Sequence, residues 1–226
     1  TRKTRFIYPW IFWRTGFPGS SEMEITSGEM KTNADGKFII NFPAIPDLSI
    51  DKNTDPVFDY QVQADITDIN GETRSANTTV TIGYKTLNLQ ISLPKGEIIN
   101  KDSVHNIIIT SKNLSDQPER VQADVKIFKL QPPQRLIRER LWSQPDTSVF
   151  SKDQYIQYFP HDEYKDELEK GSWPKTDLVY KKIDSTNTDS TFIFPPSSIA
   201  QGWYVIEATA KDQYGQEVKD VKYFQV

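Results

Sequence analysis

A histidine and five carboxylates crowd one short stretch of this sequence, and their side chains are the ones best suited to acid–base chemistry: His161, Asp162, Glu163, Asp166, Glu167 and Glu169. A glycosidase uses two such carboxylates, held at a fixed separation across a cleft. The spacing here instead predicts one short polar helix whose carboxylates face the solvent. We therefore predict no catalytic residue in this stretch and no enzymatic activity for the chain.

Metal-ligating and cofactor-binding patterns are also scarce. His105 and His161 are the only histidines, and the chain has no cysteine, whereas a zinc site needs several such ligands. We predict His105 in a strand and His161 in a helical insertion, both as surface or packing side chains. The sequence lacks the phosphate-binding glycine loops and the G-x-S-x-G elbow of hydrolases. It therefore predicts no cofactor-binding residue.

One loop shows a partial likeness to a calcium site. Asp65, Asp68 and Asn70 precede Gly71, but their spacing does not match the pattern D-x-[DN]-x-[DN]-G. A tight turn, in which Asp and Asn side chains cap their own backbone, explains the same residues equally well. We therefore predict no metal site here.

Composition narrows the class of protein further. The chain of 226 residues is 36% hydrophobic, which is enough for a core, and carries a net charge of −4. Nucleic-acid binding needs a concentrated basic face, and the densest basic stretch, Arg135–Arg140 (RLIRER), contains a glutamate and is interpreted as a solvated strand face. No apolar run approaches the ~18 residues that span a bilayer. We predict neither nucleic-acid binding nor membrane spanning.

The hydrophobic pattern has the period of β-strands. Val121, Ala123, Val125 and Ile127 alternate with mostly polar residues, and similar runs recur along the chain. Turn signals that end in Gly36, Gly71, Gly96 and Gly215 separate such runs, and glycine supplies the positive φ that tight turns need. Many short alternating strands joined by tight turns predict an all-β fold of antiparallel β-sandwiches.

The sequence of one expected strand and its turn occurs twice in the chain. Residues 60–71 read YQVQADITDING and residues 204–215 read YVIEATAKDQYG, with Tyr, Ala, Asp and Gly at the same offsets. Each copy looks like the start of the closing hairpin of one sandwich. We therefore predict two tandem domains, residues 1–86 and 87–226, with the boundary near 83–86.

The two domains differ in their expected strands. The second offers seven, at 87–93, 104–111, 119–130, 176–183, 190–194, 202–211 and 216–226. The first offers five, at 3–14, 22–30, 36–42, 57–68 and 73–83, so we expect it to lack one or two strands upstream of Thr1. Residues 131–175 interrupt the second domain as a partly helical insertion. Ser151 is expected to cap a helix through Phe159, and Pro160 to open another that ends near Gly171.

Aromatic residues leave two interpretations open. The run FIYPWIFW, Phe6–Trp13, carries aromatics on both faces of an expected strand, which favours burial in a core and against a neighbour. If Trp142, Trp173 and Trp203 are exposed and coplanar, the sandwiches are instead a binding module for a glycan or a protein. Trp203 starts a core strand, so we expect it to be half-buried.

Several strings resemble one known family. The run FDYQVQADITDINGETRSANTTVTIGY (58–84) is similar to the closing part of a macroglobulin domain from bacterial α2-macroglobulin-like proteins, most of all those of Bacteroidetes. GEMKTNADGKFIINFPAIPD (28–47) resembles an earlier hairpin of that domain. YIQYFPHDEYKDE (155–167) resembles an insertion in the next macroglobulin domain, and GWYVIEATAKDQYG (202–215) resembles its closing hairpin. The resemblance covers most of both predicted domains.

The resemblance implies a non-catalytic structural role. Macroglobulin domains are antiparallel sandwiches strung in series, and whole proteins of the family trap proteases when cleavage of a bait segment triggers a rearrangement. Many members carry a Cys-containing thioester, which this cysteine-free chain cannot hold; residues 131–150 are a weak bait candidate. The implied partners are neighbouring domains of the same polypeptide and, through the full-length protein, target proteases. The implied location is the cell envelope, although the lack of cysteine fits the cytosol equally well.

Overall fold

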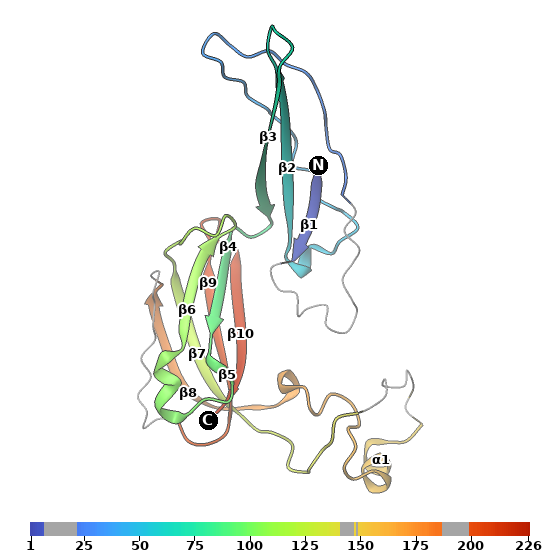
Figure 1. The fold of residues 1–226 in the computed structure, drawn as a ribbon. Coiled ribbons are helices and arrows are strands. Elements are labelled where there is room, and N and C mark those ends of the chain that lie inside the picture. The colour runs from blue at the N-terminus through green and yellow to red at the C-terminus, as the bar shows by residue number, and fades with distance from the viewer. Residues whose placement is uncertain (7–21, 141–146, 148, 187–198) are drawn as a thin grey trace. The chain divides into compact units, whose positions relative to one another are not determined.

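The computed structural model describes residues 1–6, 22–140, 147, 149–186 and 199–226 (Figure 1). Within these residues the chain forms antiparallel β-sheets and one short α-helix, which confirms the predicted all-β class. Residues 7–13 of the aromatic run, Trp142 and the strand expected at 190–194 lie outside the described residues. No described helix has the length and apolar composition required to cross a membrane.

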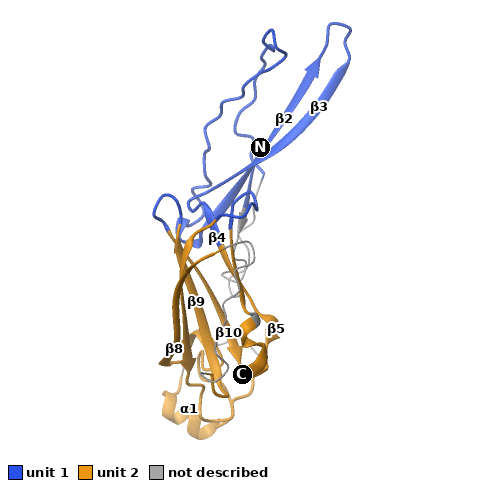
Figure 2. Ribbon diagram, turned by 90° about the vertical axis from the view of Figure 1, so that its left-hand side faces the viewer, with its two compact units in different colours: residues 1–88, 112–119, 212–216 blue, residues 89–111, 120–211, 217–226 orange. Residues whose placement is uncertain are grey.

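The described chain divides into two compact units (Figure 2). The first contains residues 1–88, 112–119 and 212–216, and the second contains 89–111, 120–211 and 217–226. One turn from the middle of the chain (112–119) and one from near its end (212–216) thus belong to the first unit. The domain boundary at residue 86 therefore stays a prediction.

The first unit is built on a three-stranded antiparallel sheet. Its strands, in the order in which they lie, are β1 (Arg2–Phe6), β2 (Pro56–Thr67) and β3 (Thr73–Gly83). The strands expected at 22–30 and 36–42 do not form: Met23 makes an isolated bridge to Arg2, and residues 24–46 join no ladder in the described structure. Strand-like alternation is not enough there, because a strand needs a neighbour to take its backbone hydrogen bonds.

Residues 42–47 cover one end of this sheet. The Phe42 and Tyr60 rings lie 5.6 Å apart, and the Tyr60 hydroxyl donates to the Ile45 carbonyl at 2.9 Å. Arg2 donates to the same carbonyl and pairs with Asp47 at 3.0 Å. Tyr60 is only 2% exposed as a result, so the core of the first unit gathers at this end of β2.

The second unit contains a four-stranded antiparallel sheet in the order β10-β9-β7-β8, faced by the two-stranded sheet β4–β6 (Figure 1). Alternate side chains of β7, β9 and β10 point into the core, and those of β4 and β6 meet them. The elements are β4 (Leu87–Ser92), β5 (Pro94–Glu97), the 3-10 helix η3 (Lys101–Asn106), β6 (Ile108–Asn113), β7 (Gln122–Leu130), β8 (Lys175–Ser185), β9 (Trp203–Lys211) and β10 (Glu217–Gln225). His105 lies exposed in η3 and not in a strand, because the apolar run that follows enters β6 only at Ile108.

The sequence repeat is a structural repeat. β2 and β3 pair in the register of β9 and β10, so that Tyr60 faces Val80 just as Tyr204 faces Phe224. Asp68 closes its turn by accepting the N–H groups of Asn70 and Glu72 on one oxygen, and Asp212 accepts those of Tyr214 and Gln216 in the same way. The self-capping turn considered for Asp68–Gly71 is thus the one that forms, and the second copy has the same turn.

The same turn occurs twice more. Asn33 and Asn113 each accept two backbone N–H groups on the side-chain oxygen, from the residues two and four positions on. The residue three positions after each capping Asx lies at positive φ: Gly36, Gly71, Asp116 and Gly215. A left-handed residue and an Asx side chain therefore define all four turns. Gly96 also has positive φ but lies inside β5.

The insertion forms one of its two expected helices. α1 (Lys152–Tyr158) begins at Ser151 with a capping box in which Ser151 and Gln154 bond each other's backbone. The helix expected from Pro160 is absent, and only the 3-10 turn η4 (Lys170–Ser172) lies there. Arginine side chains from 135–140 take the carbonyls at 160–164 that a helix would use.

The buried carboxylate of Asp220 joins the two layers of the second unit. One oxygen accepts the Ile91 N–H at 2.7 Å and the other accepts the Val221 N–H, and the residue is 2% exposed. Burial raises the pKa of Asp220 above its ordinary value, against the opposing effect of the Ile91 hydrogen bond. Its net stabilisation is therefore largest at acid pH and falls as the pH rises through the raised folded pKa.

We expect Asp220→Asn to remove this pH dependence. The difference in unfolding free energy between wild type and variant should decrease as the pH rises from about 4 to 7, because only the wild type must bury a charge. Urea denaturation at several pH values measures it. Asp184→Asn, at an exposed carboxylate of lowered pKa, is the control, and its difference should stay nearly constant from about pH 4 to 7 and change only at lower pH. A pH-independent difference for Asp220→Asn would contradict the prediction.

Asp212 and Asp68 form a matched pair for a second prediction. Both cap their turns, but the second oxygen of Asp212 also accepts the N–H and hydroxyl of Thr86, at 3.1 and 3.2 Å. We expect Asp212→Ala to cost about 1–2 kcal/mol more in unfolding free energy than Asp68→Ala, because it also leaves the Thr86 N–H without its acceptor. Equal losses in thermal or urea denaturation would mean that the Thr86 contact contributes nothing.

Candidate interaction site

The insertion between β7 and β8 holds most of the side chains that the sequence analysis weighed for acid–base chemistry and then interpreted as a solvated face. It leaves β7 after Leu130, and the Gln131 N–H donates to the Pro174 carbonyl at 3.0 Å, which closes the base of the loop. Between these points lie an arginine-rich segment, α1 and an acidic segment. The residue types therefore suit either catalysis or partner binding, and their contacts decide between the two.

Arginines tie the first segment to the third. The Arg135 guanidinium donates to the carbonyls of Pro160 and Asp162, at 2.8 and 3.0 Å, and pairs with the carboxylate of Glu167. Arg140 donates to the carbonyls of Glu163 and Tyr164. The interpretation of RLIRER as a solvated strand face is therefore wrong, since guanidiniums here replace the backbone partners of a regular element.

We call Arg135, Arg138 and Arg140 together the arginine clamp. Arg138 also binds the third segment, at the surface. Its backbone forms a bridge with the 161–162 segment, and its side chain, 73% exposed, pairs with the mostly buried carboxylate of Asp162. The opposed charge raises the already high pKa of Arg138, chiefly through this hydrogen bond. Asp162 is thus a structural partner and is not presented to a substrate.

Glu167 is a mostly enclosed carboxylate of the insertion, and its pKa is lowered. Burial by itself raises its pKa, but the Tyr164 N–H and the Arg135 guanidinium outweigh burial, and the pKa lies below its ordinary value. Lys152 adds a third contact at 3.6 Å. An ionised, already paired carboxylate is unsuited to act as a general acid, which needs a raised pKa.

The remaining residues of the acidic stretch point to separate partners. Glu163 accepts the Leu168 N–H, and the His161 ring bonds the Leu136 carbonyl at 3.1 Å while lying exposed. The surface position expected for both His105 and His161 is therefore confirmed, although neither lies in the expected helix or strand. In the described structure no three His, Asp or Glu side chains converge as metal ligands.

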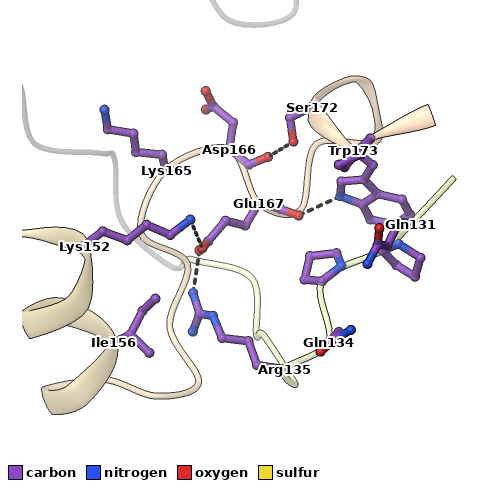
Figure 3. Close-up of a pocket in the computed structure, with 13 residues that line it drawn as sticks. Gln131, Gln134, Arg135, Lys152, Ile156, Lys165, Asp166, Glu167, Ser172 and Trp173 are labelled. Atoms are coloured by element: carbon purple, nitrogen blue, oxygen red, sulfur yellow. Dashed lines mark hydrogen bonds and ion pairs between the residues drawn. The ribbon is translucent and has the colours of Figure 1, made fainter. Parts of the chain in front are cut away.

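A solvent-open hollow of about 660 Å³ lies beneath the clamp (Figure 3). Prolines and Trp173 line one side, Lys152 and Ile156 of α1 another, and the Arg135–Glu167 pair crosses it. Two of the cations that line the hollow and could recognise an anionic ligand, Arg135 and Lys152, are paired with Glu167 instead. These paired side chains around the hollow therefore hold the insertion together.

The two described tryptophans do not form a flat sugar platform. Trp173 and Trp203 meet edge to face, with ring centres 5.5 Å apart and planes at 85°, and both are half-buried, as expected for Trp203. The Trp173 N–H is bonded to the Glu167 carbonyl, and the Lys170 ammonium lies 4.8 Å from the Trp203 ring centre. These rings fasten the insertion to β9.

Partly exposed aromatic side chains cluster on and beside α1. Phe150, Tyr158 and Phe159 are 41%, 63% and 43% exposed, and the Phe150 and Tyr158 rings lie 5.6 Å apart. Tyr155 packs beneath them against Phe159 and Tyr164. An apolar patch on a clamped, rigid loop is typical of a protein-contact surface.

Comparisons with protein-family models, curated proteins and solved structures found no match for this chain.

Sequence reasoning missed the arginine clamp. The arginine segment at 135–140 was interpreted as one solvated face. The acidic stretch 161–169 was interpreted as another. Their opposite charges and similar lengths are the signal that could have paired them. Neither segment by itself indicates which carbonyls the guanidiniums bind.

The clamp predicts a local loss of protection in Arg135→Ala. Without the guanidinium, two carbonyls and Glu167 lose their partner, so we expect residues 150–170 to be cleaved at least several times faster in limited proteolysis, with little effect on β9 and β10. Arg135→Lys should rescue only partly, because an ammonium cannot bridge all three oxygens at once. Arg138→Ala, at the exposed arginine, is the matched control. Equal sensitivity of both alanine variants would contradict the prediction.

Proposed function

We propose that this chain is a non-catalytic structural and interaction module. The observation that carries the proposal is the repeated hairpin: β2–β3 and β9–β10 share register, turn geometry and capping residue. A repeated scaffold unit is the usual solution for a protein that acts through the arrangement of its domains. In this proposal the insertion of the second unit adds a specific contact surface.

The chemistry of the acidic stretch supports a non-enzymatic role. Two enclosed carboxylates of the stretch are paired, Glu167 with Arg135 and Asp162 with Arg138. Glu167 lies in the solvent-open hollow, but its carboxylate is already bound there by Arg135. The edge-to-face tryptophan pair likewise gives no support to a glycan platform made by Trp173 and Trp203.

More specifically, we assign the chain to tandem macroglobulin domains of a protease-trapping, α2-macroglobulin-like protein of the bacterial cell envelope. The strings at 58–84 and 202–215 that resemble such domains are the hairpins that repeat in the structure. The bait candidate at 131–150 is less suitable than the sequence suggested, because Arg135 and Arg140 in its first part are bound to the carbonyls of the 160–164 segment. The partners are neighbouring domains of the same polypeptide and, through them, proteases.

A caging assay tests this function. The intact polypeptide that contains this chain is incubated with a broad-specificity protease, and residual activity is measured on a large protein substrate and on a small chromogenic peptide. We expect the large substrate to be spared while the peptide is still cut, because a caged protease remains active but sterically enclosed.

The 226-residue chain alone is the matched control, and it should spare neither substrate. Full activity on the large substrate in the presence of the intact polypeptide would overturn the trapping role. Loss of activity on both substrates would mean direct active-site inhibition, which the proposal does not include.

A further inference from the structure

The turn between β2 and β3 contains the one Asn-Gly pair of the sequence, Asn70–Gly71. This pair is suited to self-modification, because glycine has no side chain that would hinder attack of its backbone nitrogen on the asparagine amide carbon. A Cβ added at Gly71 would meet no atom within 4 Å, and the residues at 68–72 are all exposed. The reacting groups therefore have open space around them, and water reaches them.

The side-chain amide of Asn70 is free to react. In the part of the chain that the structure describes it has no hydrogen-bond partner, and only the backbone N–H of Asn70 is bonded to the capping aspartate. The asparagines that cap two of the other turns, Asn33 and Asn113, differ, since the side-chain oxygen of each accepts two backbone N–H groups. Their amides are held by the turn, and Ala34 and Leu114 follow them in place of a glycine.

A turn hydrogen bond restrains the reacting nitrogen. The Gly71 N–H donates to the Asp68 carbonyl at 3.1 Å, and this bond must open before the nitrogen can attack. Exposed turn bonds at the end of a hairpin open locally far more often than the whole domain unfolds. The folded chain can therefore reach the reactive geometry without global unfolding.

We propose that Asn70–Gly71 is a site of spontaneous modification, at which the chain converts its own asparagine to isoaspartate and aspartate. The Gly71 nitrogen gives up its proton and bonds to the side-chain amide carbon of Asn70, and ammonia leaves as a cyclic imide forms. Water then opens the imide. Attack at the main-chain carbonyl gives isoaspartate, and attack at the side-chain carbonyl gives aspartate.

The isoaspartyl product alters the turn itself. It adds a methylene group to the main chain between the N–H groups of residues 70 and 72, which Asp68 now accepts together at 2.8 and 2.9 Å. The two bonds cannot both keep this geometry in the longer chain. We therefore expect the Asp68 N–H, which donates to the Glu72 carbonyl at 2.9 Å, to exchange faster with solvent after conversion. This inference does not depend on protease trapping.

Peptide mapping of the full chain, aged in its folded state in neutral to mildly alkaline buffer, tests the proposal. The peptide that contains Asn70 should gain the mass of an amide-to-acid change, separate into two isomers and accept a methyl group from an isoaspartyl carboxyl methyltransferase. We expect conversion at least about tenfold faster than at Asn33 or Asn113, because only here is an unhindered nitrogen next to a free amide. Conversion should accelerate as the pH rises, since the nitrogen must lose its proton. Asn70→Gln should abolish it.

The second copy of the turn offers a matched gain of the site. Tyr214, 71% exposed, stands before Gly215 as Asn70 stands before Gly71, so Tyr214→Asn should create a second converting pair. An unmodified Asn70 peptide in the aged folded chain, while the same chain aged in urea converts, would overturn the proposal. Equal conversion at Asn33 would overturn it as well, because the free amide and the glycine would then have no influence. Neither result bears on the caging assay, so the two proposals fail independently.

Discussion

The structure depends on one constraint: a β-sheet with an apolar face must be covered by a second layer. The second unit meets this constraint, because β4 and β6 cover β7, β9 and β10, and the inward side chains of all five strands are buried. In the first unit, residues 42–47 cover the Tyr60 end of the sheet. Among the described residues of this sheet, Val80 and Ile66 stay 42% and 46% exposed.

Carboxylates connect elements that apolar packing alone would leave in loose register. Asp220 reaches across the core to the backbone of β4, and Asp212 closes a turn and also binds Thr86. Each accepts N–H groups that would otherwise be buried without partners. The low exposure of both residues shows that these bonds belong to the interior of the fold and are not incidental surface contacts.

The insertion is held by a different principle. It has little apolar core, and Arg135, Arg138 and Arg140 bind the carbonyls and carboxylates of the 160–167 segment instead. Charge-assisted bonds with fixed geometry can order a loop that contains no regular ladder. The same contacts occupy Asp162 and Glu167, two of the groups that suggested acid–base chemistry in the sequence.

The sequence by itself determined the local elements: the alternation at 121–130 fixed β7, Ser151 and Gln154 fixed the start of α1, and Asp68 and Gly71 fixed a turn that Asp212 and Gly215 repeat. These features depend on neighbours within a few residues. Tertiary structure alone decided whether residues 24–46 become strands, whether a helix follows Pro160 and which oxygens Arg135 binds. Those outcomes depend on partners far along the chain, since a strand needs a paired edge and a guanidinium takes whichever carbonyls the fold brings near.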